Sequence, residues 1–199
     1  MIIYGSGGHA KVIISCIVAN RDKVDLIFDD IPGRKEIYGM TVSGFYNSDI
    51  LPDQKLIIAI GDNSVRRKIS NQVKHPFGIT IHPSCIIDKT VKLGEGTVVL
   101  HNAVIQADAI IGRHVIINTS VSVDHDCVIS DFVHLAPGVI LSGNVYVGEN
   151  TLVGVGSIIA PGLTIGKNCF IAAGSVVTKD IPDGTMVRGN PAKIISYHL

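Results

Sequence analysis

One sequence repeat limits the folds open to this chain more than any other feature. Counting in steps of six from Ile81, every position as far as Val177 is aliphatic, and no residue is inserted or lost. An amphipathic helix would place apolar residues three and four apart, whereas a strict period of six is typical of a short strand, a turn and another short strand. The repeated positions between those two ends are Ile87, Leu93, Val99, Ile105, Ile111, Ile117, Val123, Ile129, Leu135, Leu141, Val147, Val153, Ile159, Ile165 and Ile171.

The period has a structural meaning. A single six-residue unit is too short to bury its own aliphatic side chain, so three units close a triangular coil, and successive coils stack as parallel strands. The repeat therefore predicts a mainly β protein built on a parallel β-helix. Pairs such as Gly143-Asn144 and Pro161-Gly162 suit its corners, where the backbone often needs a positive φ.

The chain before the repeat has a different pattern. Short apolar runs alternate with segments of helical spacing, which predicts strands at 1–4, 24–28 and 56–60 and helices at 10–19 and 64–73. Ser64 is the expected N-cap of the second helix. The pattern indicates a small Rossmann-like α/β domain, with ligand-binding loops at the carboxyl ends of its strands.

We therefore expect three segments along the chain. Residues 1–77 would form the α/β domain and residues 78–182 the β-helix. Residues 183–199 would form a capping tail that covers the last coil, with a helix at 192–197.

The glycine turn after the first strand predicts a nucleotide site. Gly5, Gly7 and Ala10 fit the dinucleotide fingerprint, and acidic residues follow about twenty positions on. Fewer than 80 residues precede the repeat, too few for both halves of a dinucleotide fold. We interpret the turn as half a nucleotide site, in which backbone N–H groups bind a diphosphate and Asp29 or Asp30 accepts hydrogen bonds from a ribose or a base. The alternative is a tight turn with solvated aspartates.

Composition excludes several classes of protein. Lys and Arg number 17 and Asp and Glu number 17, so charge gives no argument for nucleic acid or an anionic membrane. No apolar run is long enough to span a bilayer and no basic leader is apparent, which favours a cytoplasmic protein. Cys85, Cys127 and Cys169 occupy small inward positions of the repeat and are expected in the core rather than in a disulfide or a zinc site.

The histidines include one candidate general base. No two of them lie five apart, the spacing of a ligand pair in the gamma carbonic anhydrases, so no metal site is expected and a metal-dependent hydratase is disfavoured. His125 is at an outward corner between Asp124 and Asp126. A carboxylate beside an imidazole fixes its tautomer and raises its basicity.

The residue stacked on His125 supports this interpretation. One coil is 18 residues long, so Gly143 lies directly above His125, at about 4.8 Å if the coils have ordinary strand spacing. The imidazole would remove a proton from an attacking amine or hydroxyl, Asp126 would stabilise the imidazolium, and the Gly143 N–H would stabilise a developing oxyanion. The alternative is a corner histidine without a catalytic role.

Five features of the chain together resemble one family. They are the glycine turn, the Ile60-Gly61-Asp62-Asn63 segment, the repeat, the Val123-Asp124-His125-Asp126-Cys127 segment and the closing Gly189-Asn190-Pro191-Ala192-Lys193 segment. The chain is similar over its whole length to the bacterial sugar O- and N-acetyltransferases of the NeuD and PglD type. The resemblance implies a left-handed parallel β-helix and a homotrimer that uses acetyl-CoA, with active sites between subunits.

The resemblance also implies roles for individual residues. His125 would be the base and Asp126 would tune it, although the family often has Glu there. Ala173 stands where a glycine is expected. The residues implied to bind the nucleotide sugar are Gly7, Gly8, His9, Asp29, Asp30 and Asn118, and those implied to line the acetyl-CoA path are His134, Gly143, Val155 and Ala173.

These observations lead to one function with stated alternatives. We expect acetyl transfer from acetyl-CoA to the amino group of a UDP-linked 4-amino-6-deoxy sugar, with the loops around residues 29–38 selecting the acceptor. Within the same class, a GDP-linked amino sugar or a hydroxyl of sialic acid would serve as acceptor. From other classes, a non-catalytic nucleotide-sugar-binding scaffold remains as an alternative.

Overall fold

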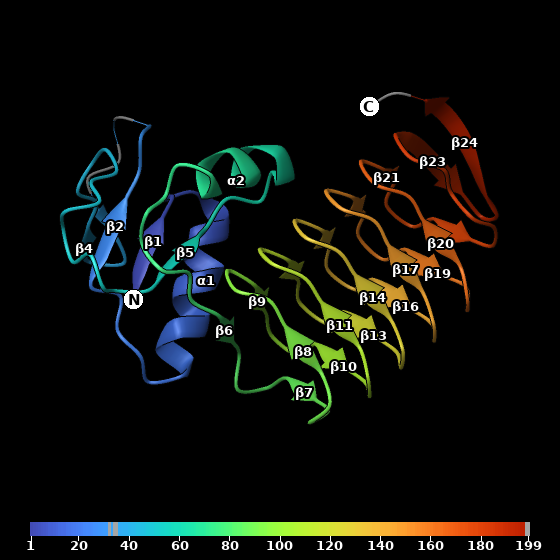
Figure 1. Ribbon diagram of the computed structural model, residues 1–199, viewed down its shortest axis with the longest axis horizontal. Coiled ribbons are helices and arrows are strands. Elements are labelled where there is room, and N and C mark those ends of the chain that lie inside the picture. The colour runs from blue at the N-terminus through green and yellow to red at the C-terminus, as the bar shows by residue number, and fades with distance from the viewer. Residues whose placement is uncertain (32, 34–35, 198–199) are drawn as a thin grey trace.

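The computed structural model describes residues 1–31, 33 and 36–197 and consists of a small α/β part followed by a solenoid (Figure 1). Residues 32, 34 and 35 of the predicted acceptor loop and residues 198–199 of the predicted tail lie outside this description. The α/β part has a parallel sheet of order β2-β1-β5 and a separate hairpin of β3 and β4. Its elements are β1 (Ile2–Tyr4), α1 (Gly8–Ala19), β2 (Leu26–Phe28), β3 (Glu36–Ile37), β4 (Met40–Thr41), β5 (Leu56–Ile58) and α2 (Asn63–Ser70).

The helix termini differ from the sequence-based expectation. Asp62, and not Ser64, is the N-cap of α2, because its carboxylate accepts the Val65 N–H at 2.8 Å. A cap must reach the amide two or three residues on, which Asp62 does from an extended backbone. The β3–β4 hairpin was not predicted.

The solenoid follows the six-residue repeat without a break. Strands 18 residues apart pair in parallel, so that Ile105 lies between Ile87 and Val123. The strands are β6 (Thr80–Ile81), β7 (Ile86–Ile87), β8 (Lys92–Leu93), β9 (Val98–Val99), β10 (Val104–Ile105), β11 (Ile110–Ile111), β12 (Ile116–Ile117), β13 (Ser122–Val123), β14 (Val128–Ile129), β15 (His134–Leu135), β16 (Ile140–Leu141), β17 (Tyr146–Val147), β18 (Leu152–Val153), β19 (Ile158–Ile159), β20 (Thr164–Ile165), β21 (Phe170–Ile171) and β22 (Val176–Val177). The predicted parallel β-helix is confirmed.

Three sheets form the faces of the prism. We call the sheet of β6, β9, β12, β15, β18, β21, β23 (Thr185–Gly189) and β24 (Ala192–Tyr197) the junction sheet. The sheet of β7, β10, β13, β16, β19 and β22 is the apolar-stripe sheet, and the sheet of β8, β11, β14, β17 and β20 is the third sheet. Every aliphatic residue of the repeat from Val99 to Val177 is at most 2% exposed. The corners have the expected positive φ, for example 59° at Asn144 and 70° at Gly162.

The α/β part rests on the junction sheet. Helix α1 lies between its own sheet and the first coils (Figure 1). Ile13, Ile14 and Ile17 of α1 share one buried cluster with Leu100 and Ile116 of the solenoid. This contact fixes the glycine turn at the start of α1 over the junction sheet.

The C-terminal tail contradicts one prediction. Residues 192–197 form a strand and not a helix: β24 (Ala192–Tyr197) pairs antiparallel with β23 (Thr185–Gly189), which itself continues the junction sheet beside β21. The free edge of β23 offers unpaired backbone groups, and Ile194, Ile195 and Tyr197 favour the extended conformation that satisfies them. The hairpin therefore closes the end of this sheet.

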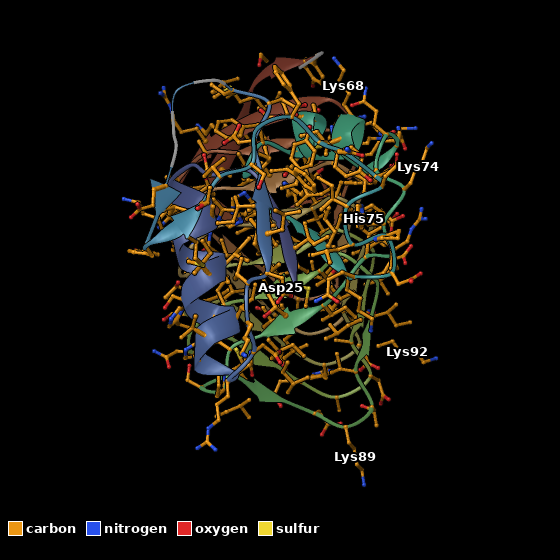
Figure 2. The ribbon with its side chains drawn as sticks, turned by 90° about the vertical axis from the view of Figure 1, so that its left-hand side faces the viewer. Asp25, Lys68, Lys74, His75, Lys89 and Lys92 are labelled. Carbon is orange, nitrogen blue, oxygen red and sulfur yellow. The ribbon has the colours of Figure 1, made fainter. Side chains whose placement is uncertain are left out.

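Two surface features complete the description. When the molecule is viewed from its α/β end, Lys68, Lys74, Lys92 and Lys89 project outward at separate points along its right-hand side, from top to bottom (Figure 2). In the described part of the chain, no helix combines the length and apolar character needed to cross a bilayer. The predicted division at residues 77/78 and 182/183 stays a prediction.

Candidate active site

His125 lies at the corner between β13 and β14, with its side chain 59% exposed. Its Nδ1 is 2.7 Å from Oδ2 of Asp126. Because a carboxylate can only accept, Nδ1 carries the hydrogen, and Nε2 of the neutral ring is left as a free base. The hydrogen bond to Asp126 and then the charge of Asp124 raise the pKa of His125. The shorter Asp side chain thus reaches the imidazole where the family often has Glu.

Gly143 leaves the space that this imidazole occupies. A Cβ added at residue 143 would lie 2.6 Å from Nε2 of His125, so a larger residue would displace the ring. The Gly143 N–H donates to no acceptor within the described residues. The His125 ring therefore lies against the backbone of Gly143, as expected for a residue one coil above.

An open hollow of about 580 Å³ adjoins the pair. Its lining includes a side chain that the sequence did not indicate, Ser142, whose outward position on a coil is the only signal that would have suggested it. The complete lining is Asp124, His125, Ser142, Gly143, Asn144, Pro161 and Gly162.

A second group of side chains lies on the junction sheet beneath the α/β part. Nε2 of His134 is 3.1 Å from the Asn118 side-chain amide nitrogen, and Nδ1 is 3.3 Å from the Gly61 carbonyl oxygen. The carbonyl only accepts, so Nδ1 donates to Gly61 and Nε2 accepts from Asn118. The ring of His9 is 6.3 Å from that of His134 between centroids. The structure thus brings together three residues that the resemblance assigned to two different ligands.

Burial keeps the two histidines of this group neutral. It is the main cause that lowers the pKa of His9 and of His134 to about 4, and the positive charge of Arg66 is the second. The sequence did not indicate Arg66, because its position in α2 does not reveal that its side chain donates to backbone carbonyls of the solenoid. At neutral pH both rings therefore offer one donor and one acceptor each.

The glycine turn leaves the start of α1 open. Gly7 is the N-cap without a side-chain cap, and the first turn contains no acidic residue. An added Cβ at Gly7 or Gly8 would meet nothing within 4 Å. Free amides at an uncapped helix start are a suitable place for a phosphate group.

Asp29 and Asp30 follow β2 and hold the loops around this turn. The Asp29 carboxylate accepts from the Ser6 N–H at 2.7 Å, from the Ser6 hydroxyl and from the Ile31 N–H at 2.9 Å. The Asp30 carboxylate accepts from the Tyr4 hydroxyl and from the Tyr46 N–H. A carboxylate has about four acceptor positions, so each keeps capacity for a ligand hydroxyl.

The remaining predicted residues form an exposed column. Val155 is 54% exposed and lies one coil before Ala173, which is also exposed, at the corner where the chain leaves the junction sheet. His125 lies at the corner between the other two sheets, so it is on the side of the prism opposite the junction sheet. One chain therefore does not bring His125 together with His9, Asn118 and His134. In residues 1–31, 33 and 36–197, no three His, Cys, Asp or Glu side chains gather to hold a metal ion.

Comparison with known proteins agrees with this geometry. Residues 1–73 match the model of the PglD N-terminal domain, and residues 144–179 match that of the bacterial transferase hexapeptide (six repeats). Perosamine N-acetyltransferase from Caulobacter crescentus, in a histidine mutant bound to CoA and GDP-perosamine, is 39% identical with a TM-score of 0.94, over 98% of this chain and 96% of that one. The chain belongs to the NeuD/PglD-type family of hexapeptide-repeat sugar acetyltransferases.

Two further relatives extend the comparison. The acetyltransferase domain of PglB from Neisseria gonorrhoeae, in complex with acetyl coenzyme A, is 34% identical with a TM-score of 0.92, over 98% of each chain. UDP-N-acetylbacillosamine N-acetyltransferase from Bacillus subtilis is 43% identical over 107 residues, which is 49% of this chain. That alignment spans about half the length of the curated relative. The family resemblance drawn from the sequence motifs is confirmed.

Proposed function

We propose that this protein transfers the acetyl group of acetyl-CoA to the amino group of a nucleotide-linked amino sugar. The observation that carries the proposal is the free Nε2 of His125, which lies over Gly143 while Asp126 accepts the hydrogen of Nδ1. Relatives that bind CoA together with GDP-perosamine, or acetyl coenzyme A alone, support the two substrates.

The proposed reaction needs no covalent enzyme intermediate. The sugar amine attacks the thioester carbonyl, and Nε2 of His125 takes the proton that the nitrogen loses. Asp126 stabilises the imidazolium, and the Gly143 N–H donates to the oxyanion of the tetrahedral intermediate. When the C–S bond breaks, the imidazolium returns its proton to the leaving thiolate, which gives the N-acetyl sugar and CoA.

The proposed acceptor site is at the start of α1. Amides of Gly7, Gly8 and His9 would bind the diphosphate, and Asp29 and Asp30 would accept from the ribose or the base. A UDP-linked 4-amino-6-deoxy sugar stays the first expectation. The relative that acts on a GDP-linked sugar covers nearly the whole chain, so it makes a GDP-linked amino sugar the second candidate.

We further propose a homotrimer with active sites between subunits. The outward side of the apolar-stripe sheet is unpartnered in a single chain, with Ile86 69%, Ile140 43% and Ile158 39% exposed, and a second copy would cover it.

Cyclic symmetry would place the His125 corner of one chain against the junction sheet of the next. Each site would then combine His125 and Gly143 of one subunit with Asn118, His134 and the glycine turn of its neighbour, and acetyl-CoA would run along Val155 and Ala173. The cytoplasmic location stays a prediction.

A panel of acceptors tests the function. The protein is mixed with acetyl-CoA and UDP-linked amino sugars, GDP-linked amino sugars or sialic acid, and free CoA thiol and the acetylated product are measured. Thiol release matched by an amide product on a nucleotide amino sugar supports the proposal. An ester product would make the protein an O-acetyltransferase, and binding without thiol release would leave a nucleotide-sugar-binding scaffold.

A further inference from the structure

Arg66 is a charged side chain buried within the molecule, at 1% exposure. It lies in α2 and makes five hydrogen bonds to three different parts of the chain. Its Nε and one terminal nitrogen reach the solenoid, and its other contacts are to the β5–α2 loop and α2 itself. The acceptors are the carbonyls of His114 at 2.9 Å, Phe132 at 2.9 Å, Ile60 at 3.0 Å and Gly61 at 3.2 Å, and the Asn63 side chain at 2.8 Å.

Each of these acceptors is neutral. Burial lowers the pKa of Arg66 to about 10, and the charge of Asp62 opposes that shift, so the guanidinium remains a cation at neutral pH. Burying a charge without an ion pair is costly even when its donors are satisfied. Five N–H donors, and not an opposite charge in contact, therefore hold the guanidinium in place.

One of the five acceptors leads into the candidate active site. The Gly61 carbonyl accepts from Arg66 and also from Nδ1 of His134. Nε2 of His134 accepts from the Asn118 amide, whose oxygen in turn accepts the Thr119 N–H at 2.8 Å. The amide group of Asn118 has two hydrogens and uses one of them on His134. Its second N–H remains as a donor at the half-buried surface of the junction sheet.

We propose that Arg66 is a positioning residue for acetyl transfer, which holds His134 as the Nδ1–H tautomer through the Gly61 carbonyl and so fixes the Asn118 amide as a donor toward the acceptor sugar. The proposal rests on the proposed function, because it assumes that a nucleotide amino sugar occupies this side of the site. Arg66 itself touches neither substrate.

The charge of Arg66 protects this arrangement. The groups that face His134 are Arg66 from α2, His9 from α1 and the Gly61 carbonyl before α2. If His134 took up a proton, both ring nitrogens would donate, and Asn118 would have to turn its oxygen toward Nε2. The site would then present an acceptor where a neutral His134 makes it present a donor.

Three variants of the full-length protein separate positioning from folding. Arg66→Met removes the charge and all five hydrogen bonds, and Arg66→Lys keeps the charge but not the planar fork. Arg67→Met is the matched control, because Arg67 is the next residue of α2, is 47% exposed and pairs with Glu149 at 3.1 Å. The readouts are the tautomer and titration of the His134 ring by nitrogen NMR, assigned with His134→Asn, and separate values of kcat and of KM for each substrate.

Arg66→Met is expected to raise the titration midpoint of His134 and to mix its tautomers. KM for the nucleotide amino sugar should rise about tenfold, the factor that corresponds to one hydrogen bond. KM for acetyl-CoA should change less than about twofold, and so should every constant of Arg67→Met, as for an exposed ion pair. Arg66→Lys should keep the low titration midpoint of His134 but still mix its tautomers. Its KM for the nucleotide amino sugar should lie between those of the wild type and Arg66→Met.

The proposal would be overturned if the Arg66 variants fold and the tautomer and titration midpoint of His134 stay as in wild type, even if KM for the nucleotide amino sugar rose. Arg66 would then only join the two parts of the fold. If Arg66→Met does not fold, Arg66→Lys carries the test alone, with mixed tautomers in support and a single tautomer against. A wild-type protein that acetylates no nucleotide amino sugar would refute the proposed function, and the NMR comparison would still decide whether Arg66 controls His134.

Discussion

At the scale of single residues, the chemistry depends on which nitrogen of each histidine carries hydrogen. In His125, Nδ1 donates a hydrogen bond to the carboxylate of Asp126, and Nε2 is left without a hydrogen next to Gly143. In His134, Nδ1 donates a hydrogen bond to the Gly61 carbonyl, but Nε2 accepts one from the Asn118 side chain. The same tautomer therefore gives a base in one position and a fixed hydrogen-bond acceptor in the other.

The carboxylate beside His125 predicts a pH effect. The pKa of His125 is raised first by its hydrogen bond to Asp126, and a base must be neutral, so kcat/KM falls as the pH decreases through that raised pKa. Asp126→Asn should move this acid limb to lower pH and reduce the plateau by about 10- to 100-fold. Asp124→Asn is the control, since it leaves the Nδ1 contact intact and should shift the limb less. An unchanged limb in Asp126→Asn would contradict the assignment.

The space above Gly143 predicts a loss of activity without a loss of fold. In Gly143→Ala the new Cβ would lie 2.6 Å from Nε2 of His125. The nearest atoms to this Cβ all belong to the exposed imidazole and none to the backbone, so the ring would rotate away and the fold would not change. We expect kcat to fall about 100-fold, as when a general base is moved out of position, with a nearly unchanged melting temperature. Ser142→Ala lines the same hollow without displacing the ring and should stay within about tenfold of wild type. Equal activity of Gly143→Ala and wild type would refute the stacked arrangement.

At the scale of elements, sequence predicts best what a local repeat enforces. The register from Ile81 to Val177 could be predicted in full, because each unit repeats the same strand and corner. The cap of α2 and the fate of residues 192–197 could not, because Asp62 and Ser64 are both good capping residues and because the strand at 192–197 depends on a free edge of β23. Arg66 was missed for the same reason, since its partners come from coils that are distant in the sequence.

The apolar-stripe sheet predicts an effect on assembly. Ile140 points outward from β16 and is 43% exposed, so Ile140→Glu would place a charge in the proposed subunit interface. We expect the mass from light scattering to fall from that of three chains to one, with loss of turnover. Ile110→Glu is the matched control, because Ile110 is 45% exposed on β11 of the third sheet. A trimer that tolerates Ile140→Glu would place the interface elsewhere.

At the scale of the whole molecule, neutral histidines gather where the α/β part meets the solenoid. His9 and His134 lie on the two sides of this junction, and the ring of His114 packs between Phe77 and Phe132. Burial lowers the pKa of each of the three to about 4, with Arg66 as the second cause. Protonation of any of these rings therefore lowers the free energy of unfolding.

This arrangement predicts acid lability. The folded pKa values near 4 lie below the ordinary value of 6.5, so the unfolded chain binds more protons between those limits, and the free energy of unfolding falls as the pH decreases from about 6.5 to 4. Urea denaturation at several pH values should show uptake of up to three protons on unfolding in this range. His114→Gln, which removes one of the titrating groups, should reduce the slope. A stability that stays constant from pH 7 to about 4.5 would contradict the buried neutral state.

The most direct test of the account is turnover by His125→Ala. With acetyl-CoA and the best nucleotide amino sugar of the panel, release of CoA thiol should fall by about 100- to 10,000-fold, the range for loss of a general base. The trimer and the dissociation constant of the nucleotide sugar should stay as in wild type. Thiol release at the wild-type rate would show that His125 is not the base and would remove the basis of the proposed reaction.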